Sequence, residues 1–162
     1  MCYTLYEPGE TGATGGVFVP WQIVADSSID LKNIEGTAPD VLFATVPFSI
    51  LVDGHEFIDT PDLDVPTLVG AMEKSRHSHT ACPAPGAWRE AFARADKTIA
   101  ITISARLSGS YNSAVAARAM ALEECPDRQV AIIDSRSTGP KVALVARKAF
   151  EILHKEPQLW FE

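Results

Sequence analysis

Residues 97–110 read KTIAITISARLSGS, and this stretch decides the fold. β-Branched residues dominate positions 97–103, which is typical of a strand buried in a parallel sheet. A turn of small and hydroxyl-bearing residues follows over 104–110. Residues from Tyr111 to Leu122 are rich in alanine and lack glycine and proline, so they predict a helix. A buried strand, a polar turn and a helix in this order predict an α/β unit.

The same pattern occurs on both sides of this stretch. The short apolar run 22–25 ends at Asp26-Ser27-Ser28, and the run 129–133 ends in the polar residues 134–139. Helices are predicted over 88–94 and from about Pro140 to Leu153, each with apolar residues at helical spacing. We therefore expect an α/β fold with a mostly parallel sheet, right-handed crossovers and helices on both faces.

A β-hairpin insertion interrupts the α/β pattern. The β-rich runs 46–52 and 55–59 flank Asp53-Gly54, a pair that favours a tight type I′ turn. Asp64 is then placed to cap a helix that has Pro66 in its first turn. Residues 78–86 predict a rigid polar loop, because Pro83 and Pro85 fix the backbone.

Length and charge limit the possible functions. The chain has 162 residues, and 14 Lys and Arg against 21 Asp and Glu give a net charge of −7. This balance argues against nucleic acid and against a polybasic membrane anchor as partners. Three cysteines without a CxxC pair, no secretory signal and no membrane-length apolar run predict a cytoplasmic protein that is not an integral membrane protein. We expect a flexible leader over 1–20, an α/β domain over 21–155 and a frayed tail over 156–162.

Hydroxyl groups follow three of the predicted strands, at 26–28, 104–110 and 134–138. In an open α/β sheet, ligands bind outside the carboxyl ends of the strands. Hydroxyls and backbone N–H groups that converge there suit a ligand of modest negative charge, such as a carboxylate. The alternative is that these Ser, Thr and Asp residues are ordinary helix N-caps.

Five segments resemble, in order and spacing, the motifs of the DegV family, and the resemblance covers residues 22 to about 150. The run Leu-Ser-Gly-Ser-Tyr-Asn-Ser-Ala over 107–114 is the most specific of them. The other matching residues lie in 23–31, 46–54, 80–86, 103–106 and 133–137.

The resemblance implies a bacterial fatty-acid-binding protein of two α/β domains, of which this chain carries the first. In such proteins the acyl chain lies in a tunnel and hydroxyls hold the carboxylate. A separate fatty acid kinase subunit then phosphorylates the bound fatty acid. The binding protein itself is not an enzyme, and it uses no metal or cofactor beyond the fatty acid ligand.

By the same resemblance, Thr80, Ser104, Ala105 and Ser108 are the expected carboxylate-binding positions. Thr80 matches a hydroxyl donor of the family, and Ser104 and Ala105 match a Ser-Ser pair whose second hydroxyl usually binds the carboxylate. The alanine retains only its N–H as a donor, and the lost bond to a charged group costs about 1.5–3 kcal/mol. Ser104 is expected to point to the opposite side of the strand from Ala105.

Three alternatives remain open from the residues. The abrupt change of pattern after 156 fits a non-functional, truncated fragment of a longer protein. Ser108-Gly109 at a strand-to-helix turn resembles a hydrolase nucleophile, although Arg106 replaces the usual first glycine and His154 is the one histidine that follows. His77, His79 and Cys82 have the residue types of a metal site, but two histidines on a polar loop are usually solvated.

Overall fold

The computed structural model describes residues 21–31, 34 and 41–156. The predicted leader and the tail from residue 157 onward lie outside this range. The central element is a four-stranded sheet in the order β2-β1-β6-β7, in which every neighbouring pair is parallel. Its strands are β1 (Trp21–Asp26), β2 (Val41–Val46), β6 (Lys97–Thr102) and β7 (Gln129–Asp134). The predicted α/β fold with a mostly parallel sheet is confirmed.

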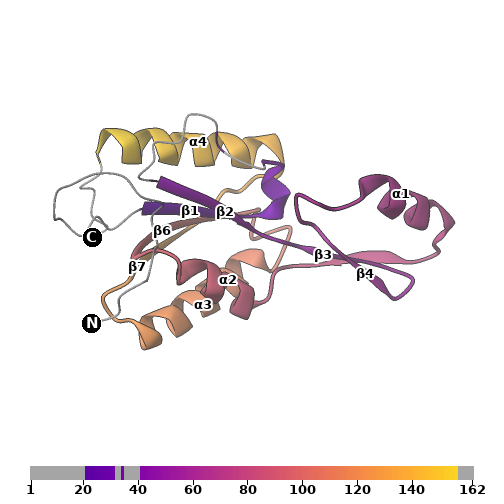
Figure 1. The fold of residues 1–162 in the computed structure, drawn as a ribbon, viewed down its shortest axis with the longest axis horizontal. Coiled ribbons are helices and arrows are strands. Elements are labelled where there is room, and N and C mark those ends of the chain that lie inside the picture. The colour runs from indigo at the N-terminus through magenta and orange to yellow at the C-terminus, as the bar shows by residue number, and fades with distance from the viewer. Residues whose placement is uncertain (1–20, 32–33, 35–40, 157–162) are drawn as a thin grey trace, which may run out of the picture.

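Helices cover both faces of this sheet, as the sequence predicts (Figure 1). Helix α4 (Pro140–Lys155) packs on one face, against alternate residues such as Ile23 and Ile101. Helices α2 (Pro85–Phe92) and α3 (Ser110–Glu124) pack on the other face, against Val24 and Ala100. Side chains alternate between the two faces of a strand, so one apolar strand supplies both cores.

A second, three-stranded antiparallel sheet extends away from the first (Figure 1). Its strands are β3 (Ser49–Val52), β4 (His55–Ile58) and β5 (Ser78–Ala81), in the order β4-β3-β5. Helix α1 (Val65–Lys74) lies between β4 and β5 in the chain. We call residues 49–81 the arm.

Local chemistry in the arm follows the sequence prediction. Asp53 and Gly54 both have positive φ, at 46° and 86°, as the predicted hairpin turn requires. Asp64 caps α1 by accepting hydrogen bonds from the N–H and the hydroxyl of Thr67. Both bonds favour the ionised carboxylate and hold the pKa of Asp64 below its ordinary value.

Two strands differ from the sequence prediction. Residues 78–81, expected to be loop, form β5, in which Thr80 lies opposite Ile50 of β3. All four residues of β5 are exposed, so no hydrophobic alternation reveals a strand, and its partner is the backbone edge of β3. Residues 41–46 form β2, a sheet strand, whereas the sequence analysis began its first hairpin strand at Val46. A short 3₁₀-helix, η1 (Ser27–Ile29), follows β1 and was not predicted from the sequence. The other differences are shifts of helix and strand ends by a few residues.

The two leucines of α4 test the core assignment. Leu153 is fully buried against the sheet, whereas Leu144 on the same helix is 67% exposed. Leu153→Ala should lower the free energy of unfolding by about 2–5 kcal/mol, because it leaves a cavity. The matched control, Leu144→Ala, should change it by about 0.5 kcal/mol or less. Urea denaturation of both variants measures the difference, and equal effects would contradict this packing.

Candidate functional site

The candidate site lies at the carboxyl ends of β1 and β6, where the order in which strands are added to the parallel sheet changes direction. Strand β1 has β2 on one side and β6 on the other, so the sheet grows in both directions from the β1–β6 pair. Open α/β sheets bind ligands beyond the carboxyl ends of the strands at this switch point. The loops after β1 and β6 therefore border the position where a ligand is expected.

Asp26, the last residue of β1, holds this edge of the sheet together. Its side chain is fully buried, and its Oδ2 accepts hydrogen bonds from the Ile103 N–H at 2.9 Å and the Ser110 hydroxyl at 2.6 Å. Its Oδ1 accepts a third bond from the Ser28 hydroxyl. One carboxylate thereby joins the ends of β1 and β6 to the first residue of α3. Its negative charge at a helix N-terminus is favourable.

The turn formed by residues 104–108 contains two hydroxyl groups, each of which can still donate a hydrogen bond. Ser104 Oγ accepts the Arg106 N–H at 3.3 Å, and Ser108 Oγ accepts the Ser110 N–H at 3.2 Å. Neither hydroxyl donates to another residue in the described part of the chain, so each O–H proton is available for an acceptor. Ser104 is buried and Ser108 is half-buried. This turn suits a ligand that only accepts hydrogen bonds.

The alternative that the strand-end Ser, Thr and Asp residues are helix N-caps fits only some of them. The N-cap positions of α3 and α4 are Gly109 and Gly139, which have no side chain to cap with. Ser108 does bond the N–H of the first residue of α3. Ser28, Ser104 and Ser135 instead make hydrogen bonds within their own turns, whereas the Ser27 and Ser110 hydroxyls donate to Asp59 and Asp26 on other segments. The expectation for Ser104 also changes. Strand β6 ends at Thr102, so the alternation of a strand no longer decides the directions of Ser104 and Ala105.

Ala105 is exposed, and its N–H is already engaged. It donates to Asp134 Oδ1 at 3.1 Å, and the same oxygen accepts the Arg136 N–H at 2.9 Å. The Ser104 N–H donates to the Ser137 carbonyl at 2.9 Å. The loop after β7 is therefore fastened to the turn after β6. A ligand carboxylate would have to compete with Asp134 for the Ala105 N–H.

Thr80 lies in β5 of the arm, and the chain that follows it leads to the first turn of α3. The Ser113 hydroxyl of α3 donates to the Pro83 carbonyl, and a Cβ built on Gly109 would lie 3.3 Å from Cys82 Sγ. The segment just after Thr80 thus packs against the first turn of α3. The Thr80 side chain is exposed and makes no hydrogen bond with Ser104, Ala105 or Ser108 in this structure.

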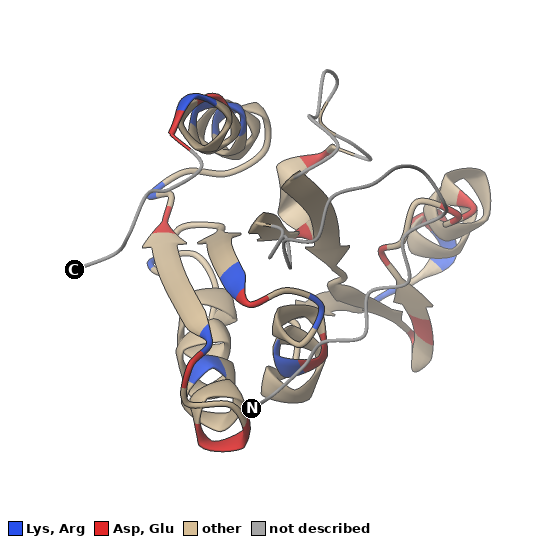
Figure 2. Ribbon diagram, turned by 60° about the vertical axis from the view of Figure 1, so that its left-hand side comes forward, with Lys and Arg blue, Asp and Glu red and all other residues tan. Residues whose placement is uncertain are grey.

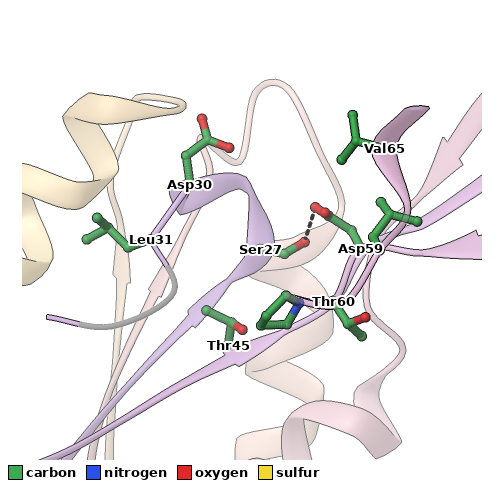
Figure 3. A pocket seen from close by; sticks show the side chains of 9 residues that line it. Ser27, Asp30, Leu31, Thr45, Asp59, Thr60 and Val65 are labelled. Atoms are coloured by element: carbon green, nitrogen blue, oxygen red, sulfur yellow. Dashed lines mark hydrogen bonds between the residues drawn. The ribbon is translucent and has the colours of Figure 1, made fainter. Parts of the chain in front are cut away.

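A cavity of about 240 Å³ lies beside the switch point, between the sheet and the arm (Figure 3). The Ser27 hydroxyl donates to Asp59 Oδ2 at 2.6 Å across it, and Ser27 Oγ accepts the Phe48 N–H at 3.0 Å. None of the four predicted ligand residues lines it. The lining residues are Ser27, Asp30, Leu31, Thr45, Asp59, Thr60, Pro61, Leu63 and Val65.

This cavity has no signature in the sequence. Ser27 was noted as a strand-end hydroxyl, but the residues that close the cavity come from the chain after β4, about thirty positions later. Spacing gives no indication that these two segments meet. The chemistry of the cavity is mixed, with apolar walls at Leu31, Leu63 and Val65 and two carboxylates at Asp30 and Asp59. An anionic head group is disfavoured there, whereas an apolar segment fits.

The geometry gives no support to the hydrolase or metal alternatives. His154 stacks on Phe150 near the end of α4, about 21 Å along that helix from its start beside the site. The other three histidines, at 55, 77 and 79, belong to the arm. Within the described ranges, no group of three His, Cys, Asp or Glu residues could hold a metal ion. No helix there is both long and apolar enough to cross a membrane.

Comparison with protein families and curated sequences gives consistent matches. The family model described as "Uncharacterised protein, DegV family" matches residues 20–159. A DegV domain-containing protein of Streptococcus gordonii is 38% identical over 134 residues, and one of Streptococcus pneumoniae is 35% identical over the same length. Each match covers 82% of this chain and 48% of the relative. The chain thus spans about half the length of the curated relatives it matches.

Two solved structures extend the likeness to three dimensions. The fatty acid kinase B3 protein of Streptococcus pneumoniae, loaded with linoleic acid, matches with a TM-score of 0.81 and 34% identity, over 84% of this chain and 49% of that one. A DegV family protein of Eubacterium eligens, loaded with heptadecanoic acid, matches with a TM-score of 0.77 and 40% identity, over 83% and 48% of the two chains.

The buried carboxylate of Asp26 should be needed for stability. Asp26→Asn keeps the shape of the side chain but removes its charge. The new amide NH₂ would face the Ile103 N–H and the hydroxyls of Ser28 and Ser110, which already act as donors. We expect a loss of about 1–3 kcal/mol in the free energy of unfolding. The matched control is Asp127→Asn, in the exposed turn before β7, which should have little effect. Urea denaturation compares the two, and an unchanged stability of Asp26→Asn would contradict this role.

Proposed function

The chain belongs to the DegV family, and on that premise we propose that it binds a long-chain fatty acid through its carboxylate at the carboxyl edge of the parallel sheet. The observation that carries the proposal is the Ser104–Ser108 turn. It lies at the switch point and holds two hydroxyls whose protons are unused. A fatty-acid carboxylate has acceptor oxygens and no donor, so it complements such a turn. The relatives that share this fold hold linoleic and heptadecanoic acid.

The proposed ligand residues have unequal roles. Ser104 and Ser108 donate their hydroxyl protons to the carboxylate, and Thr80 approaches from the arm as a third donor. Ala105 lies in the turn but has no hydroxyl group, and its N–H donates to Asp134. We place the carboxylate at the turn and away from the cavity, because Asp30 and Asp59 would repel it there.

The cavity has a supporting role for the acyl chain. Its volume of about 240 Å³ is below the range of about 300–1,000 Å³ that is usual for a whole drug-sized ligand. The apolar wall formed by Leu31, Leu63 and Val65 fits part of an acyl chain, and each buried methylene adds about 0.8 kcal/mol. The rest of the acyl chain requires surface from outside residues 21–156. We propose that the second α/β domain of the family supplies it.

The wider role is also a proposal. We infer a non-catalytic protein of the cytoplasm that presents its fatty acid to a separate kinase subunit, which forms the acyl phosphate. A form that does not bind fatty acid is the second candidate, and the same experiment separates the two.

A lipid assay tests the proposal directly. The protein is purified from bacterial cells and its lipids are extracted and identified by mass spectrometry, and delipidated protein is then titrated with oleate. Co-purifying long-chain fatty acid and saturable oleate binding at one site per chain are expected. Absence of both would contradict the proposed binding and would favour the non-binding candidate.

Restoring the missing hydroxyl should strengthen binding. Ala105 is exposed, so Ala105→Ser adds a donor at the turn without crowding the core. One hydrogen bond to a charged group is worth about 1.5–3 kcal/mol, so the Kd for oleate should fall about tenfold to a hundredfold. Ala119→Ser, at an exposed position on α3, is the matched control and should leave the Kd unchanged. Isothermal titration measures both, and equal Kd values for the two variants would contradict this placement of the carboxylate.

A further inference from the structure

Arg136 has a backbone conformation that its side chain does not explain. Its φ is +51°, and the other non-glycine residues with positive φ in the described part of the chain are Asp30 and Asp53. Aspartate tolerates this left-handed region because its short polar side chain bonds locally, and Asp53 lies in a hairpin turn. Arginine has no such compensation. Strained positions of this kind persist only where the surroundings fix them, and they concentrate at functional sites.

The surroundings of Arg136 fix it firmly. Its N–H donates to Asp134 Oδ1 at 2.9 Å. The serines on either side bond to each other, since the Ser137 N–H donates to Ser135 Oγ at 3.1 Å and the Ser135 hydroxyl donates to the Ser137 carbonyl at 3.2 Å. The same Ser137 carbonyl accepts the Ser104 N–H. The backbone of Arg136 therefore has a fixed position relative to the Ser104–Ser108 turn.

The charged groups at the carboxyl edge of the parallel sheet indicate a function for Arg136. Asp26 and Asp134 both end strands here, and their carboxylates oppose the approach of an anionic ligand. Figure 2 shows Lys and Arg residues interspersed with Asp and Glu residues along the described part of the ribbon. Arg136 is exposed, and its guanidinium forms no ion pair with any residue that the structure describes. The Arg136 and Ala105 N–H groups bond to one oxygen, so the backbone of Arg136 lies next to that of Ala105.

We propose that Arg136 binds the carboxylate of the ligand and supplies the positive charge that replaces the missing hydroxyl at position 105. The inference rests on the proposed function, and it adds a residue and a charge preference to that site. A guanidinium pairs with a carboxylate through charge-assisted hydrogen bonds, which are about twice as strong as neutral ones. The site should therefore prefer a fatty acid over an uncharged lipid of the same chain length.

The test compares oleate with oleyl alcohol, which shares its chain but carries no charge. Arg136→Gln should weaken oleate binding at least tenfold and leave oleyl alcohol binding within about twofold. Arg136→Lys should retain most of the oleate affinity, because it keeps the charge. Raising the salt concentration should weaken oleate binding to the wild type more than to Arg136→Gln. Arg118→Gln, exposed on α3, removes the same charge far from the site and should bind like the wild type.

A second variant separates charge from folding. Arg136→Gly fits the positive φ without strain, so it should fold at least as stably as the wild type and yet show the same selective loss of oleate affinity. Unchanged oleate binding in Arg136→Gln and Arg136→Gly would overturn the inference while leaving the proposed function intact. An equal loss of oleate and alcohol binding would assign Arg136 a structural role and would also overturn it. A wild type that binds neither lipid would overturn both this inference and the proposed function.

Discussion

The carboxylate of Asp26 is the interaction on which the rest of the structure depends. It is buried at the end of β1 and accepts bonds from β6, from α3 and from the short turn that follows β1. Without it, the loops after β1 and β6 would have no common anchor. Because those loops form the switch point, the geometry of the site follows from one buried negative charge and the donors around it.

A second carboxylate repeats this arrangement one strand further along. Asp134 ends β7 and accepts the N–H groups of Ala105 and Arg136, as Asp26 does for the preceding pair of strands. Two carboxylates thus shape an edge that we propose receives a third, from the ligand. The hydroxyl protons of Ser104 and Ser108 and the guanidinium of Arg136 are the groups that make such an approach favourable. Charge balance, rather than shape alone, then decides what binds.

The sequence predicted the parallel sheet, the hairpin and the serine-rich turn because each has a local signature. β-Branched runs indicate buried strands, Asp53-Gly54 indicates the hairpin turn, and the LSGS run at 107–110 lies between a strand and a helix. Strand β5 was missed because its four exposed residues carry no alternation and pair only through the backbone. The cavity was missed because Ser27 and Asp59 meet through the tertiary fold. The engagement of the Ala105 N–H was missed because its partner lies on another strand.

Binding of a carboxylate at the Ser104–Ser108 turn is tested most directly by backbone NMR of this 17.5 kDa chain. The measurement is a ¹H–¹⁵N titration with oleate. We expect the largest shifts at the amides of residues 104–110 and 134–137, with smaller shifts around the cavity. Shifts confined to the far end of the sheet or to the outer face of α1, or no shifts at all at saturating oleate, would contradict the account.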